Sequence, residues 1–169
     1  MGQETESICG SHDLSAAKGR EDGHDAASRM KDFGWDANKG IPVTLDVEER
    51  TYADNPAGTV DYVRAWTRTV KADGYRPYVY SSPAAVNAFA RDHLDIDAAW
   101  VASDFYGHFE NVSPYGHELD GQIGHNFDAH NRAWQYAGAA PTVYIEDVGY
   151  VDCDVADLEL APKPGGTNL

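Results

Sequence analysis

The chain has 169 residues, 42% of them hydrophobic, which is enough to form one packed domain. Its 28 acidic residues outnumber its 13 basic residues and give a formal net charge of −15 at pH 7. Because this charge repels phosphate backbones and anionic lipid head groups, we expect neither nucleic acid nor membrane as a partner.

The sequence leaves the cellular compartment open. No run of residues approaches the ~20 apolar residues of a membrane-spanning helix, and the opening residues MGQETESICGSHD lack the basic and apolar regions of a signal peptide. Cys9 and Cys153 could form a disulfide in an oxidising compartment, but two cysteines make no disulfide framework.

Three regions are expected along the chain. Residues 1–23 are mostly Gly, Ser, Asp, Glu and Lys without a hydrophobic period, which predicts a polar, disordered leader. Residues 24–160 carry the alternating patterns of a folded domain, and residues 161–169 are expected to form a flexible tail. Within the domain, a short amphipathic helix is predicted over residues 24–33, and Gly34 can end it.

The stretch IPVTLDVE, residues 41–48, predicts a short strand. Its apolar residues alternate with Thr44, Asp46 and Glu48, and this period of two sends the two sets to opposite faces. The later predicted elements are, in chain order, a helix over 55–74, a strand over 77–80, a helix over 82–94, a strand over 98–103, a polar insertion over 104–131, and extended segments over 133–136, 142–145 and 150–155.

This alternation of strands and helices predicts an α/β fold with a largely parallel sheet and helices on its outer face. An open doubly wound sheet would satisfy the alternation, but such a fold usually carries a glycine-rich turn, and neither GxGxxG nor GxxxxGK occurs here. A (β/α)8 TIM-type barrel fits better, because catalytic side chains of such barrels follow the carboxyl ends of strands. Such positions are held here by Asp46, Glu48, Tyr80, Asp104 and Asp152.

The order of five motifs resembles a known family. LDVE is followed by VYSS at 79–82, WVAS at 100–103, WQY at 134–136 and VDCDV at 151–155. This series resembles the barrel-type lysozymes (muramidases) of glycoside hydrolase family 25 and, more closely, bacterial glycoside hydrolase-like domains of unknown function. The resemblance covers about residues 24–158. It implies a TIM-type barrel, a peptidoglycan-type saccharide as substrate or ligand, and proteins that are often secreted or associated with the cell wall.

The chain is short for such a barrel. A full barrel generally needs at least ~200 residues, while this sequence supplies only about five strand and helix units. We therefore expect a partial barrel that covers the later units, from an internal start, a fragment or a shortened protein. The resemblance also implies an acidic residue on the first strand, and no matching strand precedes His24. An open arc would expose a strand edge, which predicts self-association.

Carboxylate pairs suit glycoside hydrolysis, because one carboxyl group protonates the leaving oxygen while another stabilises positive charge or attacks. At ~3.3 Å per strand residue, the α-carbons of Asp46 and Glu48 lie ~6.5 Å apart, close enough for each charge to influence the other's proton affinity. We predict Glu48 as the acid. The resemblance implies that Asp46 stabilises the oxocarbenium ion or orients the N-acetyl group. Asp152 is a third catalytic candidate or a turn residue.

Sugar rings present apolar faces beside hydroxyl edges, so a saccharide cleft mixes aromatic and polar side chains. Tyr80, Trp134 and Tyr136 fit the aromatic part, although aromatic residues on strands also pack in cores. Gln135 could bond to an acetamide or hydroxyl group, and Asp104 follows a strand end. Trp100 is expected in the core.

No metal or other cofactor is expected. His108, His117, His125 and His130 alternate with acidic residues in the insertion, but their spacing matches no ligand motif such as HExxH. The insertion could equally cover the substrate, since loops at this face of a barrel carry specificity.

Three functional hypotheses remain. The first is a glycosidase acting on an amino-sugar polysaccharide such as peptidoglycan. The second is a non-catalytic saccharide-binding or cell-wall-binding domain on the same scaffold, and the third is an inactive fragment. Turnover, binding without turnover, or neither would distinguish them.

Overall fold

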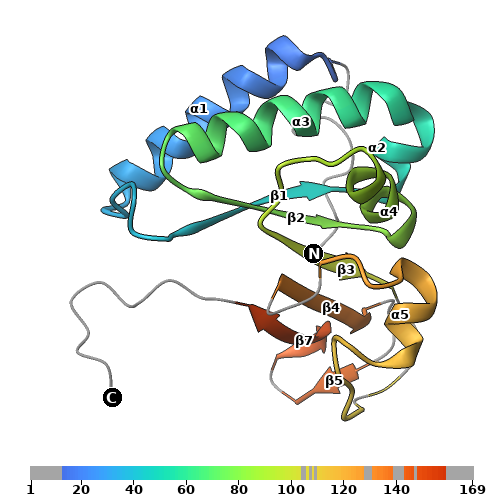
Figure 1. Ribbon diagram of the computed structural model, residues 1–169. Helices are drawn as coiled ribbons and strands as arrows, with labels where there is room; N and C mark the ends of the chain where they lie inside the picture. Colours follow the sequence, from blue (N-terminus) through green and yellow to red (C-terminus); the bar gives the residue numbers. More distant parts are fainter. Residues whose placement is uncertain are drawn as a thin grey trace.

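A computed structural model describes residues 13–103, 106, 108, 110–127, 131–138, 143–146 and 148–158. Its centre is a five-stranded sheet in the order β1, β2, β3, β4, β7, beside a separate two-stranded hairpin of β5 and β6 (Figure 1). The strands are β1 Pro42–Val47, β2 Arg76–Ser81, β3 Ala98–Ala102, β4 Asn131–Ala137, β5 Val143–Ile145, β6 Gly149–Val151 and β7 Cys153–Leu158. The helices are α1 Ala16–Asp32, α2 Glu49–Asp54, α3 Pro56–Ala72, α4 Pro83–Arg91 and α5 His117–Ile123.

The first four strands of the sheet are parallel, and β7 pairs with β4 in the antiparallel direction. The mostly parallel α/β sheet predicted from the sequence is therefore confirmed. The order of β1 to β4 follows the chain without reversal, whereas a doubly wound sheet reverses its order at a switch point. The described residues form no closed barrel, because β1 and β7 are opposite edges of an open sheet. Self-association through such an edge stays a prediction.

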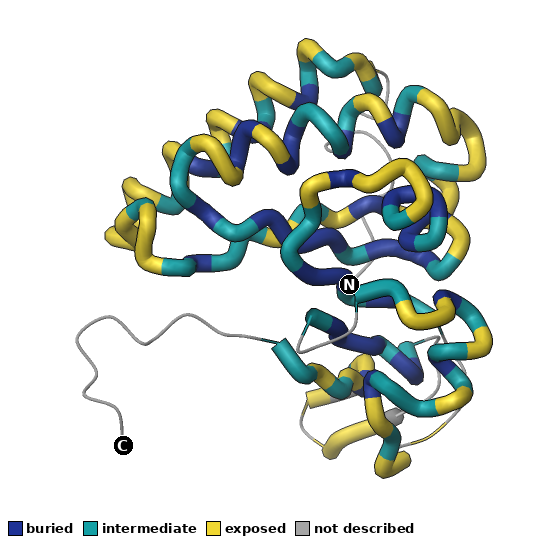
Figure 2. Tube along the Cα trace, in the orientation of Figure 1, coloured by how far each residue is buried: buried dark blue, intermediate teal, exposed yellow. Residues whose placement is uncertain are grey.

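Strand periodicity separates the two faces of the sheet. Leu45 and Val47 of β1 pack with buried residues of α3 and α4, such as Val63 and Phe89. The alternate residues Thr44 and Asp46 are exposed. Figure 2 shows that buried residues are concentrated along the strands of the sheet. The helices therefore cover one face, and the other face is left to polar residues that approach the carboxyl ends of the strands.

Helix α1 begins at Ala16, eight residues before the predicted start at His24, so the leader prediction is wrong from that point on. The reason is the contact between α1 and α3. A Cβ atom added at Gly19 would collide with the backbone carbonyl of Tyr62, and one at Gly23 would lie 2.9 Å from Cβ of Thr69. Glycines that usually indicate a loop here allow two helices to approach closely.

Two other elements differ from the sequence analysis. The insertion contains α5, whose Leu119 and Ile123 are buried in the core, so it is not aperiodic throughout. Its attachment to the sheet depends on Arg132, which is 0% exposed and ion-pairs with Asp120 at 2.6 Å. The short helix α2 follows β1 directly and has no buried residue, which explains why no hydrophobic period indicated it.

Among the described residues, no helix is both long enough and apolar enough to cross a membrane. Cys153 is buried with 8% of its surface exposed. Cys9 lies outside the described residues, as do the first 12 residues of the predicted leader and the predicted tail.

Candidate functional site

Three side chains form a row across the polar face of the sheet. Asp46 on β1 is in register with Tyr80 on β2, and Tyr80 is in register with Trp100 on β3. Residues in register on neighbouring strands point to the same face. The rings of Tyr80 and Trp100 accordingly meet edge to face, with centroids 5.7 Å apart.

A cavity of about 620 Å³ lies where the parallel strands end. Its walls come from residues that follow β1, β2 and β3 and from the β4 and β7 side of the sheet. The lining comprises Val47, Glu48, Glu49, Tyr80, Ser82, Pro83, Ala102, Ser103, Gln122, Gln135, Gly138 and Asp152. Four of the predicted site residues, Glu48, Tyr80, Gln135 and Asp152, thus share one cavity.

The first carboxylate pair is electrostatically coupled. Glu48 follows β1 directly and is extended at φ −61° and ψ 147°, which continues the alternation of the strand. Desolvation raises the pKa of Asp46 above its ordinary value. Desolvation and then the charge of Asp46 raise the pKa of Glu48. Glu48 therefore keeps its proton to a higher pH than an isolated glutamate in water, as a proton donor requires.

Tyr80 lies between the carboxylates. Burial, followed by the charges of Glu48, Asp46, Asp152 and Asp154, raises its pKa to about 12. The hydroxyl is therefore protonated at neutral pH, and it donates a hydrogen bond to Oε1 of Gln135 at 2.5 Å. Because Oε1 accepts this bond, the amide nitrogen is the group of Gln135 that can act as a donor.

The second acidic pair, Asp152 and Asp154, lies at the start of β7. The sequence pattern predicts Asp152 at the end of a largely parallel strand set, but in the structure Asp152 precedes the antiparallel strand β7. Because β7 runs in the opposite direction, its beginning lies at the edge where β1 to β4 end.

Asp154 is a carboxylate that the sequence analysis did not select. It accepts a hydrogen bond from Nε1 of Trp100 at 2.9 Å, and it lies opposite Gln135 on β4. Desolvation raises its pKa, against the lowering effect of the bond from Trp100. In VDCDV, acidic residues alternate with apolar ones as they do in LDVE, and this pattern could have indicated Asp154 from the sequence.

Hydroxyl and amide groups line the opposite wall of the cavity. Ser103 donates a hydrogen bond to Oε1 of Gln122 at 2.6 Å, which links the end of β3 to α5. Ser82 precedes Pro83, the first residue of α4, and does not cap that helix with its side chain. Within the described part of the chain, its buried hydroxyl oxygen has no hydrogen-bond partner.

The family model of the Rv2525c-like glycoside hydrolase-like domain matches residues 3–156. The chain belongs to this family. Comparison with curated proteins gives no match.

The fold of this Rv2525c-like domain is similar to a solved structure, described as a 1.07 Å crystal structure of an uncharacterized B. stearothermophilus protein. The TM-score is 0.53 and the sequence identity is 20%, over 86% of this chain and 65% of that chain. The likeness concerns the fold alone. The chain spans less than two thirds of the length of that protein.

The aromatic predictions for this Rv2525c-like domain need correction. Trp134 and Tyr136 are 0% and 2% exposed and pack in the core with Leu119 of α5. They flank Gln135, and successive strand residues point to opposite faces, so all three could not line one cleft. Trp100 was expected in the core, but it is partly exposed and lies on the polar face of the sheet.

The remaining predictions concern the insertion. Asp104 and His130 lie outside the described residues. Across the part of the chain that the structure describes, no three His, Cys, Asp or Glu side chains are grouped so that they could hold a metal ion. His108, His117 and His125 each lie beside a carboxylate on the exposed surface.

Proposed function

We propose that the cleft of this glycoside hydrolase-like domain binds an amino-sugar polysaccharide of the peptidoglycan type and hydrolyses one of its glycosidic bonds. The observation that carries the proposal is the common cavity of Glu48 and Asp152, with the paired Tyr80 and Gln135 between them. Two acidic groups with amide and hydroxyl groups between them match the needs of glycoside hydrolysis.

In this mechanism the Glu48 carboxyl group gives its proton to the leaving glycosidic oxygen while the bond from that oxygen to the anomeric carbon breaks. The raised pKa of Glu48 favours the protonated form that this step requires. Asp46, as a carboxylate, stabilises the positive charge at the anomeric carbon or orients the N-acetyl group of the substrate. Water supplies the hydroxyl group of the new reducing end. Asp152 is a third carboxylate, which accepts the proton that this water loses.

The proposal extends to the ancestry of the scaffold. We interpret the open sheet as the later strands of a TIM-type barrel related to family 25 lysozymes. Its support is the consecutive order of β1 to β4 and the cavity at their carboxyl ends, the position of active sites in such barrels. On this interpretation, the edge of β1, which pairs with no further strand among the described residues, corresponds to the position of the first strands of such a barrel.

Binding without turnover is the second candidate function. It is favoured by the exposure of Asp46 and Glu48 on an edge strand, since among the described residues no strand lies beyond β1 to shield them from water. Exposed carboxylates act in a higher dielectric and stabilise charge less strongly. An inactive fragment is the third outcome, in which neither property is found.

The test is incubation with purified peptidoglycan and quantification of new reducing ends. We expect release by the wild-type chain and none by Glu48→Gln, which keeps the shape of the side chain but has no acidic proton to transfer. Sedimentation with the insoluble polymer should be equal for both proteins. Equal release by both would exclude Glu48 as the acid. Sedimentation without release would favour the binding domain, and neither would favour the fragment.

A further inference from the structure

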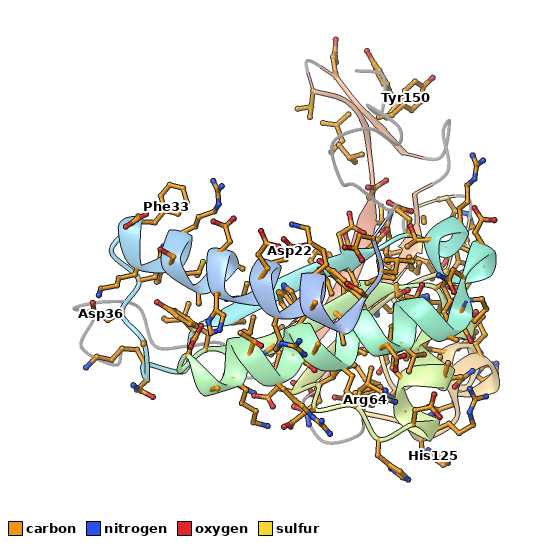
Figure 3. The ribbon with its side chains drawn as sticks, turned by 90° about the horizontal axis from the view of Figure 1, so that it is seen from above. Asp22, Phe33, Asp36, Arg64, His125 and Tyr150 are labelled. Carbon is orange, nitrogen blue, oxygen red and sulfur yellow. The ribbon has the colours of Figure 1, made fainter. Side chains whose placement is uncertain are left out.

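The β5 and β6 hairpin carries two exposed tyrosines. Tyr144 lies directly opposite Tyr150 in the antiparallel pair, so both rings are on the same face of the hairpin. Their centroids are 5.3 Å apart with an interplanar angle of 67°. The two residues are 64% and 60% exposed, and Figure 3 shows Tyr150 on a segment that projects away from the helices.

Residues on both sides of this hairpin in the sequence line the cavity. Gly138 follows β4 and lines the cavity, and Asp152 follows β6 and lines it as well. Tyr150 is only two residues before Asp152, which is about 6.6 Å along an extended chain. The tyrosine pair is therefore an exposed aromatic surface that lies close in the chain to the acidic cleft.

We propose that Tyr144 and Tyr150 form a platform on which further sugar rings of a bound polysaccharide stack, beyond the rings held in the cleft. The inference rests on the proposed saccharide function of that cleft. The C–H face of a pyranose ring packs on an aromatic ring, while the phenolic hydroxyls reach the hydroxyl edges of the sugar. Two rings inclined at 67° offer the sugar one ring face and one ring edge.

The negative charge of the hairpin and of the whole chain indicates which class of ligand can bind here. The hairpin sequence VYIEDVGYV contains two acidic residues and no lysine or arginine, and the chain as a whole carries a net charge of −15. A polyanion or an anionic lipid surface would be repelled. A neutral sugar backbone has apolar ring faces that can pack on the tyrosine pair and hydroxyl groups that can bond to the acidic cleft.

The experiment compares short and long ligands. Isothermal titration calorimetry would measure the affinity of the full chain for the dimer and the hexamer of N-acetylglucosamine, since the longer hexamer can occupy the cleft and still offer further rings to the hairpin. The variants are Tyr144→Ala/Tyr150→Ala, which removes both rings, and Tyr144→Phe/Tyr150→Phe, which retains them. Melting curves would check folding, and the exposed positions predict little change.

We expect the wild type to bind the hexamer more tightly than the dimer. The double alanine variant should lose about tenfold in hexamer affinity and none in dimer affinity, and the phenylalanine variant should retain most of the preference. Unchanged hexamer affinity in the alanine variant, with dimer binding intact, would overturn the platform and leave the cleft proposal standing. An equal loss in the phenylalanine variant would contradict ring stacking.

Two further outcomes would also overturn the inference. If the wild type binds neither ligand, the proposed saccharide function fails, and the platform fails with it. If sedimentation velocity shows a wild-type dimer that the double alanine variant dissociates, while hexamer affinity stays unchanged, the tyrosines serve an interface between two copies of the chain.

Discussion

The Tyr80 hydroxyl donates its hydrogen to Oε1 of Gln135 across 2.5 Å, although the two residues are on β2 and β4 with β3 between them. The bond therefore spans a strand on the polar face of the sheet. It connects the side of the cleft formed by β2 to the side formed by β4. The raised pKa of Tyr80, about 12, keeps the donor protonated at neutral pH.

A double-mutant cycle should detect this bond. Tyr80→Phe and Gln135→Leu should each lower the free energy of unfolding by about 1 kcal/mol, because each removes the bond and leaves one polar partner. The double variant should lose less than the sum of the two, with a coupling of about 0.5 to 1.5 kcal/mol. Urea unfolding measures all four proteins. Strict additivity would contradict the bond.

The proton affinity of Glu48 should depend on Asp46. The negative charge of Asp46 raises the pKa of Glu48, so Asp46→Asn should lower it towards the ordinary glutamate value. The protonated fraction of Glu48, and any activity that requires it, should then be lost at a lower pH as the pH rises. Carbon-13 NMR of the side-chain carboxyl group would follow the titration directly.

The matched control is Asp36→Asn, which removes an exposed acidic residue from the same chain. Its effect on the Glu48 titration should be negligible because exposed, distant charges are screened. A Glu48 pKa that stays unchanged in Asp46→Asn would show that the two carboxyl groups are not coupled.

The Arg132 guanidinium should be essential for holding the insertion on the sheet. It ion-pairs with Asp120 and donates hydrogen bonds to the carbonyls of Gly124 and Asn126 at 2.6 and 2.7 Å. Arg132→Met would leave these acceptors unpaired, and we expect a loss of about 3 kcal/mol, or roughly 10 °C in Tm. Differential scanning calorimetry would measure it.

Arg29→Met provides the comparison for that result. The Arg29 side chain is 70% exposed and pairs with Asp25 on the same helix. Such a surface pair contributes little to the free energy of unfolding, because solvent and salt screen the two charges. If the two variants melt at the same temperature, the buried Arg132 network does not stabilise the fold in the way described.

Close packing of α1 on α3 should make Gly19 intolerant of any side chain. The Cβ of Gly19→Ala would meet the backbone carbonyl of Tyr62, which cannot move aside without shifting the helix. We expect a loss of about 2 kcal/mol in urea unfolding. Gly121→Ala in α5 meets no atom within 4 Å and should be neutral or stabilising by about 0.5 to 1 kcal/mol. A stable Gly19→Ala would contradict the helix contact.

The sequence predicted the parts of the site that depend on local period. Leu45 and Val47 alternate with Asp46 and Glu48, so the strand and its carboxylate face could be predicted. The start of α1 could not, because Gly19 and Gly23 look like loop residues until the partner helix is known. Only their separation of four residues, which places both glycines on one face of a helix, could have indicated a helix contact.

Other differences arose from information that the local sequence does not contain. The direction of β7 depends on its pairing with β4, and that direction brings Asp154 beside Gln135. Trp134 and Tyr136 were assigned to the cleft with Gln135, although alternation along β4 allows only one of the two sets to face it. Stricter use of the strand period would have corrected this assignment from the sequence alone.

The central claim is that the cleft at the carboxyl ends of the strands binds a saccharide, and amide chemical-shift mapping tests it most directly. Spectra of the nitrogen-15 labelled full chain would be recorded with increasing N-acetylglucosamine hexamer. The account predicts the largest shifts for Ser82, Ser103 and Gln135, which line the cavity. Shifts confined to the smaller depression beside Tyr52 and Arg91, or no shifts at all, would contradict it.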